Sequence, residues 1–102
     1  MTHPAPRTPP VDPTLAELGA RIRARREELG LSQEAAAERA AMHTSNYARI
    51  ERGQQGPRVQ LLLLLAEALE TTPGVLLDGL PLPQLVVEEV VVTTRTRRRP
   101  GD

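Results

Sequence analysis

The chain has 102 residues, 39% of them apolar, and a formal net charge of zero that balances thirteen arginines against thirteen acidic residues. This length suits one small domain rather than two, and the neutral charge means that any surface for nucleic acid has to be local. The absence of cysteine excludes disulfides and cysteine-based metal sites, and the single aromatic residue, Tyr47, argues against the stacking surfaces that bind single-stranded nucleic acids.

The N-terminal segment, residues 1–13, holds five of the ten prolines and is expected to form a disordered arm. Thr14 and Glu17 have the spacing of a capping box, which predicts that a first helix begins near residue 14 or 15. Gly30 suits the left-handed position that ends such a helix. No apolar run approaches the ~20 residues of a membrane span, and no signal-peptide core is present in the first thirty residues, so we expect a cytoplasmic protein with no membrane partner.

The segment 31–53 predicts two short helices joined by a tight turn. Ser32 can cap the first helix, a break falls at residues 41–43, and Gly53 can end the second. This is the outline of a helix-turn-helix, whose second helix can lie in the major groove of DNA.

Two more helices are expected after Gly53. Residues 59–69 form a strongly apolar segment that contains five consecutive leucines, and Thr72 followed by Pro73 predicts a cap and the first residue of a short helix to about residue 78. Five leucines in succession cover nearly the whole circumference of a helix, so some of them should lie outside the core of one subunit. Residues 14–79 are therefore interpreted as one compact, all-α, five-helix domain.

The C-terminal segment, residues 80–102, changes character. Its valine-rich part, residues 85–94, favours a β-strand, which needs a partner edge to be stable. We interpret it as a strand-like extension that pairs with a second subunit or docks on another protein, with disorder as the alternative. The arginines at 95–99 form a basic tail.

The middle of the chain resembles the lambda-repressor-like, Cro/Xre-type helix-turn-helix family over roughly residues 15–78. The resemblance is carried by an ordered series of runs: Leu18-Gly19-Ala20-Arg21-Ile22-Arg23, Arg26, Gly30-Leu31-Ser32-Gln33-Glu34, Ala37 and Arg49-Ile50-Glu51-Arg52-Gly53. It implies a sequence-specific domain that binds double-stranded DNA through the major groove as a dimer. Ala41 departs from the pattern, because the family usually has glycine in this turn.

The resemblance assigns DNA contacts to the helix-turn-helix and to the loop that follows it. Gln33 is expected to contact the DNA backbone and to support the recognition helix. Arg49, on a recognition helix at about 44–52, is the strongest candidate for a bidentate contact with guanine. The full set of expected DNA-binding residues is Gln33, His43, Thr44, Ser45, Asn46, Arg49, Arg52 and Arg58. The alternative for Arg49 is a phosphate clamp or a solvated side chain, and for Gln33, Asn46, Arg52 and Arg58 it is a solvated surface residue. His43 corresponds to the capping position of the helix.

Other positions are interpreted as architecture. Arg26 and Glu51 match a structural ion pair of the family, and Tyr47 is expected in the core with its hydroxyl near the surface and a phosphate. The expected dimer residues are Leu76, Leu77, Val86, Val87, Val90, Val91 and Val92. No metal or cofactor is expected.

The sequence thus predicts a DNA-binding transcriptional regulator, with repression favoured over activation, that binds a pseudo-palindromic operator as a homodimer. The alternative keeps the fold but makes it an antitoxin-like or adaptor module that holds a protein partner through its C-terminal strand. An enzyme is not expected, because no nucleophile, base and orienting group occur at useful spacing and no phosphate-binding loop is present.

Overall fold

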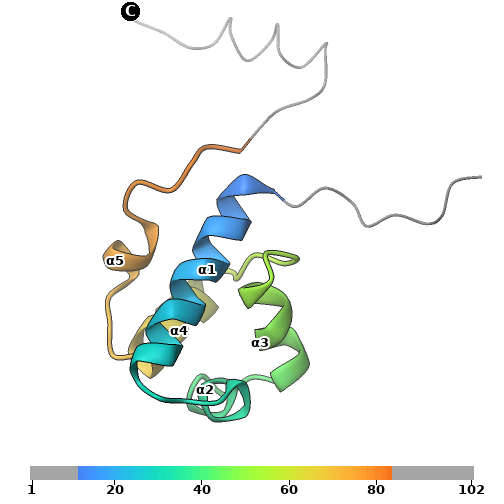
Figure 1. Ribbon diagram of the computed structural model, residues 1–102, viewed down its shortest axis with the longest axis vertical. Helices are drawn as coiled ribbons and strands as arrows, with labels where there is room; N and C mark the ends of the chain where they lie inside the picture. Colours follow the sequence, from blue (N-terminus) through green and yellow to red (C-terminus); the bar gives the residue numbers. More distant parts are fainter. Residues whose placement is uncertain (1–11, 84–102) are drawn as a thin grey trace, which may run out of the picture.

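The computed structural model describes residues 12–83, which form five α-helices and no strand (Figure 1). The helices are α1 (Pro13–Glu28), α2 (Gln33–Arg39), α3 (Thr44–Glu51), α4 (Val59–Ala68) and α5 (Pro73–Leu77). The all-α prediction is therefore confirmed for this part of the chain. The expected N-terminal arm up to residue 11, the strand at 85–94 with its five valines and the basic tail lie outside the described residues.

The start of α1 corrects the sequence prediction. Oδ1 of Asp12 accepts hydrogen bonds from the amides of Thr14 (2.7 Å) and Leu15 (3.3 Å), so the cap is Asp12 and the helix begins at Pro13. Aspartate is a stronger cap than threonine, and proline is favoured at the first helical position because it has no amide hydrogen to leave unpaired. The Thr14 hydroxyl instead donates to the carbonyl of Pro81 at 2.6 Å, which ties the start of α1 to the segment after α5.

The other predicted helix ends are confirmed. Oγ of Ser32 accepts from the amide of Ala35 at 3.0 Å, and Oγ1 of Thr72 accepts from the amide of Val75 at 3.2 Å. Ala41 has a φ of 59°, the left-handed conformation that Gly30 adopts at the end of α1. A β-carbon in this conformation costs about 1–2 kcal/mol, so the turn between α2 and α3 is held at a cost.

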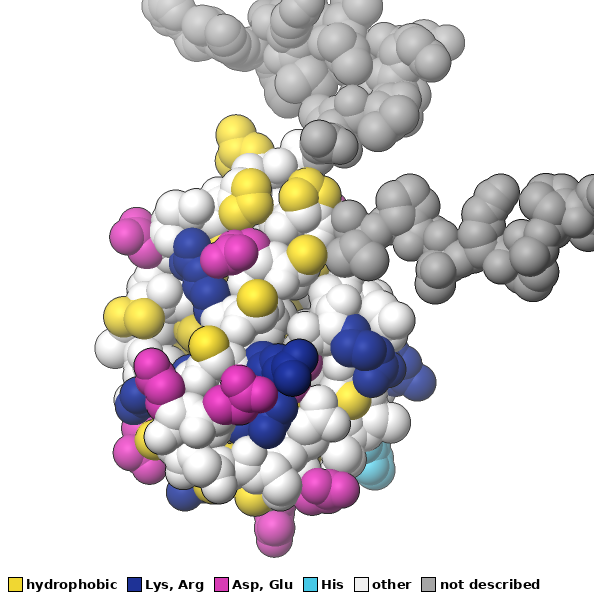
Figure 2. Space-filling model, viewed as in Figure 1, with side chains coloured by type: hydrophobic (Ala, Val, Ile, Leu, Met, Phe, Trp, Pro, Cys, Tyr) yellow, Lys and Arg dark blue, Asp and Glu magenta, His cyan; other side chains and the backbone are white. Residues whose placement is uncertain are grey.

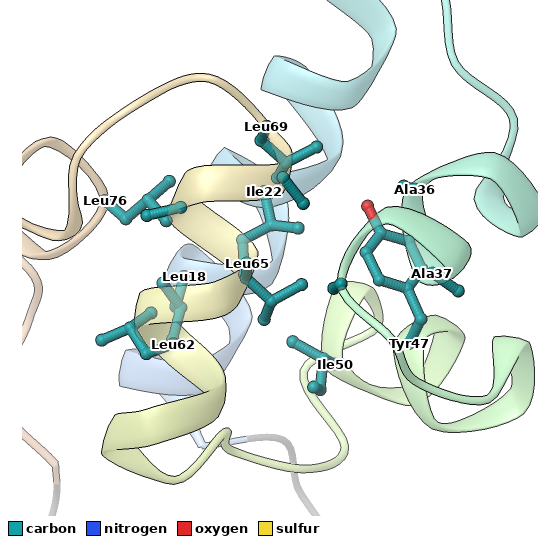
Figure 3. Packing of buried hydrophobic residues seen from close by; sticks show 13 residues of the cluster. Leu18, Ile22, Ala36, Ala37, Tyr47, Ile50, Leu62, Leu65, Leu69 and Leu76 are labelled. Carbon is teal, nitrogen blue, oxygen red and sulfur yellow. The ribbon is translucent and has the colours of Figure 1, made fainter.

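The core lies where all five helices meet (Figure 3). Leu18 and Ile22 of α1 pack with Leu65 of α4 and with Leu69, the residue that follows α4. The ring of Tyr47 lies beside the small side chains of Ala36 and Ala37 of α2. The alanines of α2 therefore let α3 approach closely.

Two expectations about leucines have different outcomes. Leu63 and Leu64 are 51% and 50% exposed, which confirms that part of the leucine run lies outside the core. Leu76, expected at a dimer surface, is only 2% exposed and belongs to the core, whereas Leu77 is 41% exposed. The dimer prediction for Leu76 was wrong because a helix of five residues gives too short a pattern to show which neighbour faces inward.

Three arginines hold the ends of α4 and α5. Arg21 donates to the carbonyls of Leu76 (3.0 Å) and Asp78 (2.6 Å). Arg25 donates to the carbonyl of Leu69 (2.8 Å), and Arg39 donates to that of Ala68 (3.0 Å). These bonds satisfy carbonyls that a helix end leaves unpaired. In the described part of the chain, no helix has both the length and the hydrophobicity needed to cross a membrane.

Gly19 sets the distance between α1 and α3. A β-carbon at this position would lie 2.4 Å from the carbonyl oxygens of both Ile50 and Glu51, closer than non-bonded atoms can approach. These are backbone atoms, so the contact cannot be relieved by turning a side chain. The end of α3 is thus fixed against α1 at a glycine.

We expect Gly19→Ala to lower the free energy of unfolding by about 2–3 kcal/mol, measured by urea denaturation. Helix propensity alone predicts the opposite sign, since alanine in a helix is worth roughly 0.5–1 kcal/mol more than glycine. Gly74→Ala is the matched control, because this glycine is also helical, in α5, and its β-carbon would meet only Oγ1 of Thr72, at 3.9 Å. A Gly19→Ala protein more stable than the parent chain would show that α1 and α3 can move apart without cost, which contradicts the prediction.

Candidate nucleic-acid interface

The outer face of α3 is polar and accessible. Ser45 and Arg49, one helical turn apart, are exposed, and Arg52 follows them at the end of the helix. Thr44 and Asn46 are half-buried, while His43 is exposed at the start of α3 and makes no capping hydrogen bond. Figure 2, viewed as in Figure 1, shows basic side chains over the side of the molecule formed by α3. The expected recognition residues therefore lie on one accessible face.

Arg49 is held in place by its own helix. Its Nη1 donates to Oδ1 of Asn46 at 2.7 Å, which fixes one edge of the guanidinium. A guanidinium has five N–H donors, so this bond leaves several of them for another acceptor. Asn46 thus orients Arg49, and its own expected contact with DNA stays a prediction.

The arginines around α3 differ from the others in their partners. Arg21, Arg23, Arg25, Arg26 and Arg39 form all the ion pairs found among residues 12–83. The expected DNA-binding arginines at 49, 52 and 58 are exposed and form none there; Arg52 only donates to Oε1 of Gln54 at 3.3 Å. Their charge is available to an external anion.

The positive charge is unevenly spread along this surface. Near the start of α3, a hollow is lined by Glu34 and Glu38 of α2 together with His43 and Thr44. Two carboxylates there oppose the approach of a phosphate, whereas the other end of the surface carries Arg52 and Arg58. Phosphate contacts are therefore favoured at the end of α3 and in the loop that follows it.

Beneath this surface four side chains form one hydrogen-bonded group, which we call the Glu51 network: Arg26, Gln33, Tyr47 and Glu51. Nε and Nη2 of Arg26 donate to the two carboxylate oxygens of Glu51 at 2.6 and 3.1 Å. The hydroxyl of Tyr47 donates to Oε2 at 2.5 Å, and Nε2 of Gln33 donates to Oε1 at 3.0 Å. One buried carboxylate thus joins α1, α2 and α3.

The network keeps its charges. Burial alone would raise the pKa of Glu51, but the hydrogen bonds from Arg26, Tyr47 and Gln33 outweigh it and hold that pKa below its ordinary value of 4.5. The hydrogen bond to Glu51 raises the pKa of Arg26, and burial together with the carboxylate raises that of Tyr47. At neutral pH the group is therefore an ion pair with a protonated phenol.

Two sequence expectations change here. The Tyr47 side chain is fully buried and its hydroxyl is bound to Glu51, so the expected position near a surface phosphate was wrong. Gln33, expected to contact the DNA backbone, also supports α3 from inside through Glu51. The spacing of four residues between Tyr47 and Glu51 on one helix was the available signal for their contact. The resemblance indicates that Gln33 supports the recognition helix, but no local signal identifies Glu51, eighteen residues away, as the group that it binds.

Comparisons with known proteins point to one group of proteins. A family model described as a helix-turn-helix domain matches residues 17–80. Among solved structures, the restriction-modification controller protein C.AhdI from Aeromonas hydrophila is 37% identical, with a TM-score of 0.60 over 61% of this chain and 94% of that one. Comparison with curated proteins finds no match.

Two further similar structures were solved with DNA. The P22 c2 repressor, in complex with a synthetic operator, is 35% identical over 61% of this chain and 94% of its own, with a TM-score of 0.58. SinR, described as the master regulator for biofilm formation and solved in complex with DNA, is 35% identical over 60% of this chain and 98% of its own, with a TM-score of 0.58.

Proposed function

This chain belongs to the helix-turn-helix domain family, of the lambda-repressor-like type, and on that premise we propose that it is a transcriptional regulator that reads double-stranded DNA with α3. The observation that carries the proposal is the exposed guanidinium of Arg49, held by Asn46 and free of any ion pair within residues 12–83. Residues 14–79 are the proposed DNA-binding domain.

Roles follow from position on the surface. Arg49 is assigned to guanine, with Thr44 and Ser45 contacting neighbouring base edges from the same helix. Arg52 and Arg58 are assigned to phosphates at the end of α3, together with Gln33 at the start of α2. His43 is assigned to the edge of this surface, beside the hollow that it lines with Glu34 and Glu38.

Dimeric binding to a pseudo-palindromic operator is part of the proposal. The chain is neutral, and residues 12–83 contain only three arginines without an ion pair there, so we expect few phosphate contacts per subunit. One copy then binds weakly, and a second linked copy multiplies the affinity. Such a dimer, seated on a promoter, represses by excluding polymerase. The protein-interaction alternative rests on residues 85–94, which lie outside the described part of the chain.

The proposal is tested by selecting duplexes from a random pool with the full chain. We expect enrichment of one sequence with two related half-sites about one helical turn, roughly 34–36 Å, apart. Affinity for it should fall steeply between 50 and 200 mM salt, because bound phosphates release counterions. A pool that stays unenriched after repeated rounds would count against sequence-specific binding.

A further inference from the structure

The outward face of α4 carries three large apolar side chains that the rest of residues 12–83 leaves exposed. Val59, Leu63 and Leu64 are 69%, 51% and 50% exposed. With Gln60 and Glu67 they occupy an arc of about 140° on the helix, at 100° per residue. The leucines that enter the core, at positions 62, 65 and 69, lie on the opposite side. A surface of three adjacent large apolar side chains on one helix indicates a contact with another macromolecule.

A groove runs along one edge of this face. It has a volume of about 570 Å³ and is lined by Gln55 and Gly56 of the loop after α3, by Arg58, and by Gln60, Leu61 and Leu64. Leu61 and Leu64 make one wall of the groove apolar, and the loop residues make the other wall polar. Such a groove suits a partner surface that has an apolar centre and a polar rim.

The two ends of α4 carry unlike charges. Its N-terminal end has Arg58, no acidic residue in the first turn and no side-chain cap, while its last turn has no basic residue and contains Glu67. Glu67 is thus at the unfavourable end of its own helix dipole, where a cation would be stabilising. A second α4 running antiparallel would place each Glu67 beside the positive end of the other helix.

We propose that the outward face of α4 is a seam between two copies of this chain, packed antiparallel about a two-fold axis. The need for a dimer comes from the proposed function, on which this inference rests, and the face of α4 is the surface that would form the dimer. An isologous contact requires a patch that is complementary to itself, and apolar residues between oppositely charged ends meet this requirement.

The charges also fix the register. When Arg58 faces Glu67 of the partner subunit, the two-fold axis passes close to position 63, midway along the helix. Leu63 therefore lies against its own copy. A helix of ten residues is only about 15 Å long. The seam is accordingly smaller than the ~1,200–2,000 Å² of a stable dimer, and the pair is expected to form weakly in free solution and fully on an operator.

The absence of cysteine from the chain allows a direct test. Leu63→Cys, oxidised at low micromolar concentration in the presence of the selected duplex, is expected to form a covalent dimer, because cysteines on the axis can reach disulfide geometry. Ala20→Cys is the control, since Ala20 is an exposed apolar residue on α1, outside every expected dimer surface. Crosslinking of Leu63→Cys that is no faster than that of Ala20→Cys overturns the proposal.

A second variant separates this inference from the proposed function. Leu63→Arg should fold, as judged by circular dichroism, but sediment as a monomer at concentrations where the parent chain associates, and bind the full operator at least tenfold more weakly. Its binding to an isolated half-site should stay unchanged, which keeps DNA reading intact. A dimeric Leu63→Arg protein with full operator affinity refutes the seam and leaves the DNA proposal standing. If no duplex is selected, Leu63→Cys is oxidised without DNA at higher protein concentration; a covalent dimer then supports the seam while the DNA proposal fails.

Discussion

Replacing Arg49 with alanine is expected to lower affinity for the selected operator by roughly 30-fold to 10⁴-fold. A bidentate arginine–guanine pair contributes about 1–3 kcal/mol of discrimination, and a symmetric dimer loses two such pairs, or about 2–6 kcal/mol. The side chain is exposed, and among residues 12–83 it is hydrogen-bonded only to Asn46, so its removal leaves the core untouched. Fluorescence anisotropy with the selected duplex measures the loss.

The matched control for Arg49→Ala is Arg23→Ala. Both changes remove one positive charge from an exposed helical arginine, but Arg23 lies on α1 and pairs with Glu27 at 3.0 Å. The control should leave operator affinity within about twofold, since distant surface charge acts only through a screened field. Equal losses from the two variants would mean that total charge, rather than a base contact, accounts for binding.

A further readout distinguishes base reading from phosphate binding. Arg49→Ala should change the preferred base at one position of each half-site, whereas Arg52→Ala should weaken binding to all sequences alike and reduce its salt dependence. A variant of Arg49 that keeps the same sequence preference with uniformly weaker binding would assign this residue to the phosphate backbone.

Local signals explain why much of the fold could be predicted from the sequence. Ser32, Thr72 and Gly30 act within a turn of their own positions, so the chemistry of one residue is enough to place a helix end. Asp12 and Thr14 compete as caps only two residues apart, and the spacing of the Thr14–Glu17 pair favoured the wrong one.

Long-range partners explain why the rest could not be predicted. Thirteen arginines are alike in a sequence, and only the folded chain shows that Arg21, Arg25 and Arg39 bind carbonyls of α4 and α5. The candidate recognition face could be predicted from the helix-turn-helix pattern, because it is a property of one helix. Its support could be predicted only in part: the resemblance gave the Arg26–Glu51 ion pair, which the structure confirms, but the bond from Gln33 to Glu51 joins two helices without any local signal.

Glu51→Gln is expected to lower the free energy of unfolding by about 3–5 kcal/mol, the cost of leaving one member of a buried ion pair without its partner. The carboxylate accepts from Arg26, Gln33 and Tyr47, and the side-chain amide of glutamine would turn donor hydrogens toward some of these donors. The Arg26 side chain is only 13% exposed, so water cannot replace the lost acceptor easily. Chemical denaturation measures the effect.

Two companion variants define what the loss means. Tyr47→Phe removes one neutral donor and leaves the ion pair, so it should cost only about 1 kcal/mol. Glu38→Gln, at an exposed carboxylate of α2, should change stability by less than about 0.5 kcal/mol. A Glu51→Gln effect as small as that of Glu38→Gln would show that the network does not hold α3 in place.

The pH dependence of stability gives an independent check, because it reports the charge of Glu51 itself. The pKa of Glu51 is lower in the folded chain than its ordinary value of 4.5, so the folded state releases this proton more readily than the unfolded state does. The resulting stabilisation is fully present above pH 4.5 and is lost as the pH falls through the folded pKa. Glu51→Gln has no such proton, so the stability difference between it and the parent chain should shrink as the pH is lowered from 6 toward 3. A difference that stays constant over this range would mean that folding does not change the pKa of Glu51, and a parent chain that gains stability relative to Glu51→Gln as the pH falls would mean that Glu51 is protonated in the folded protein.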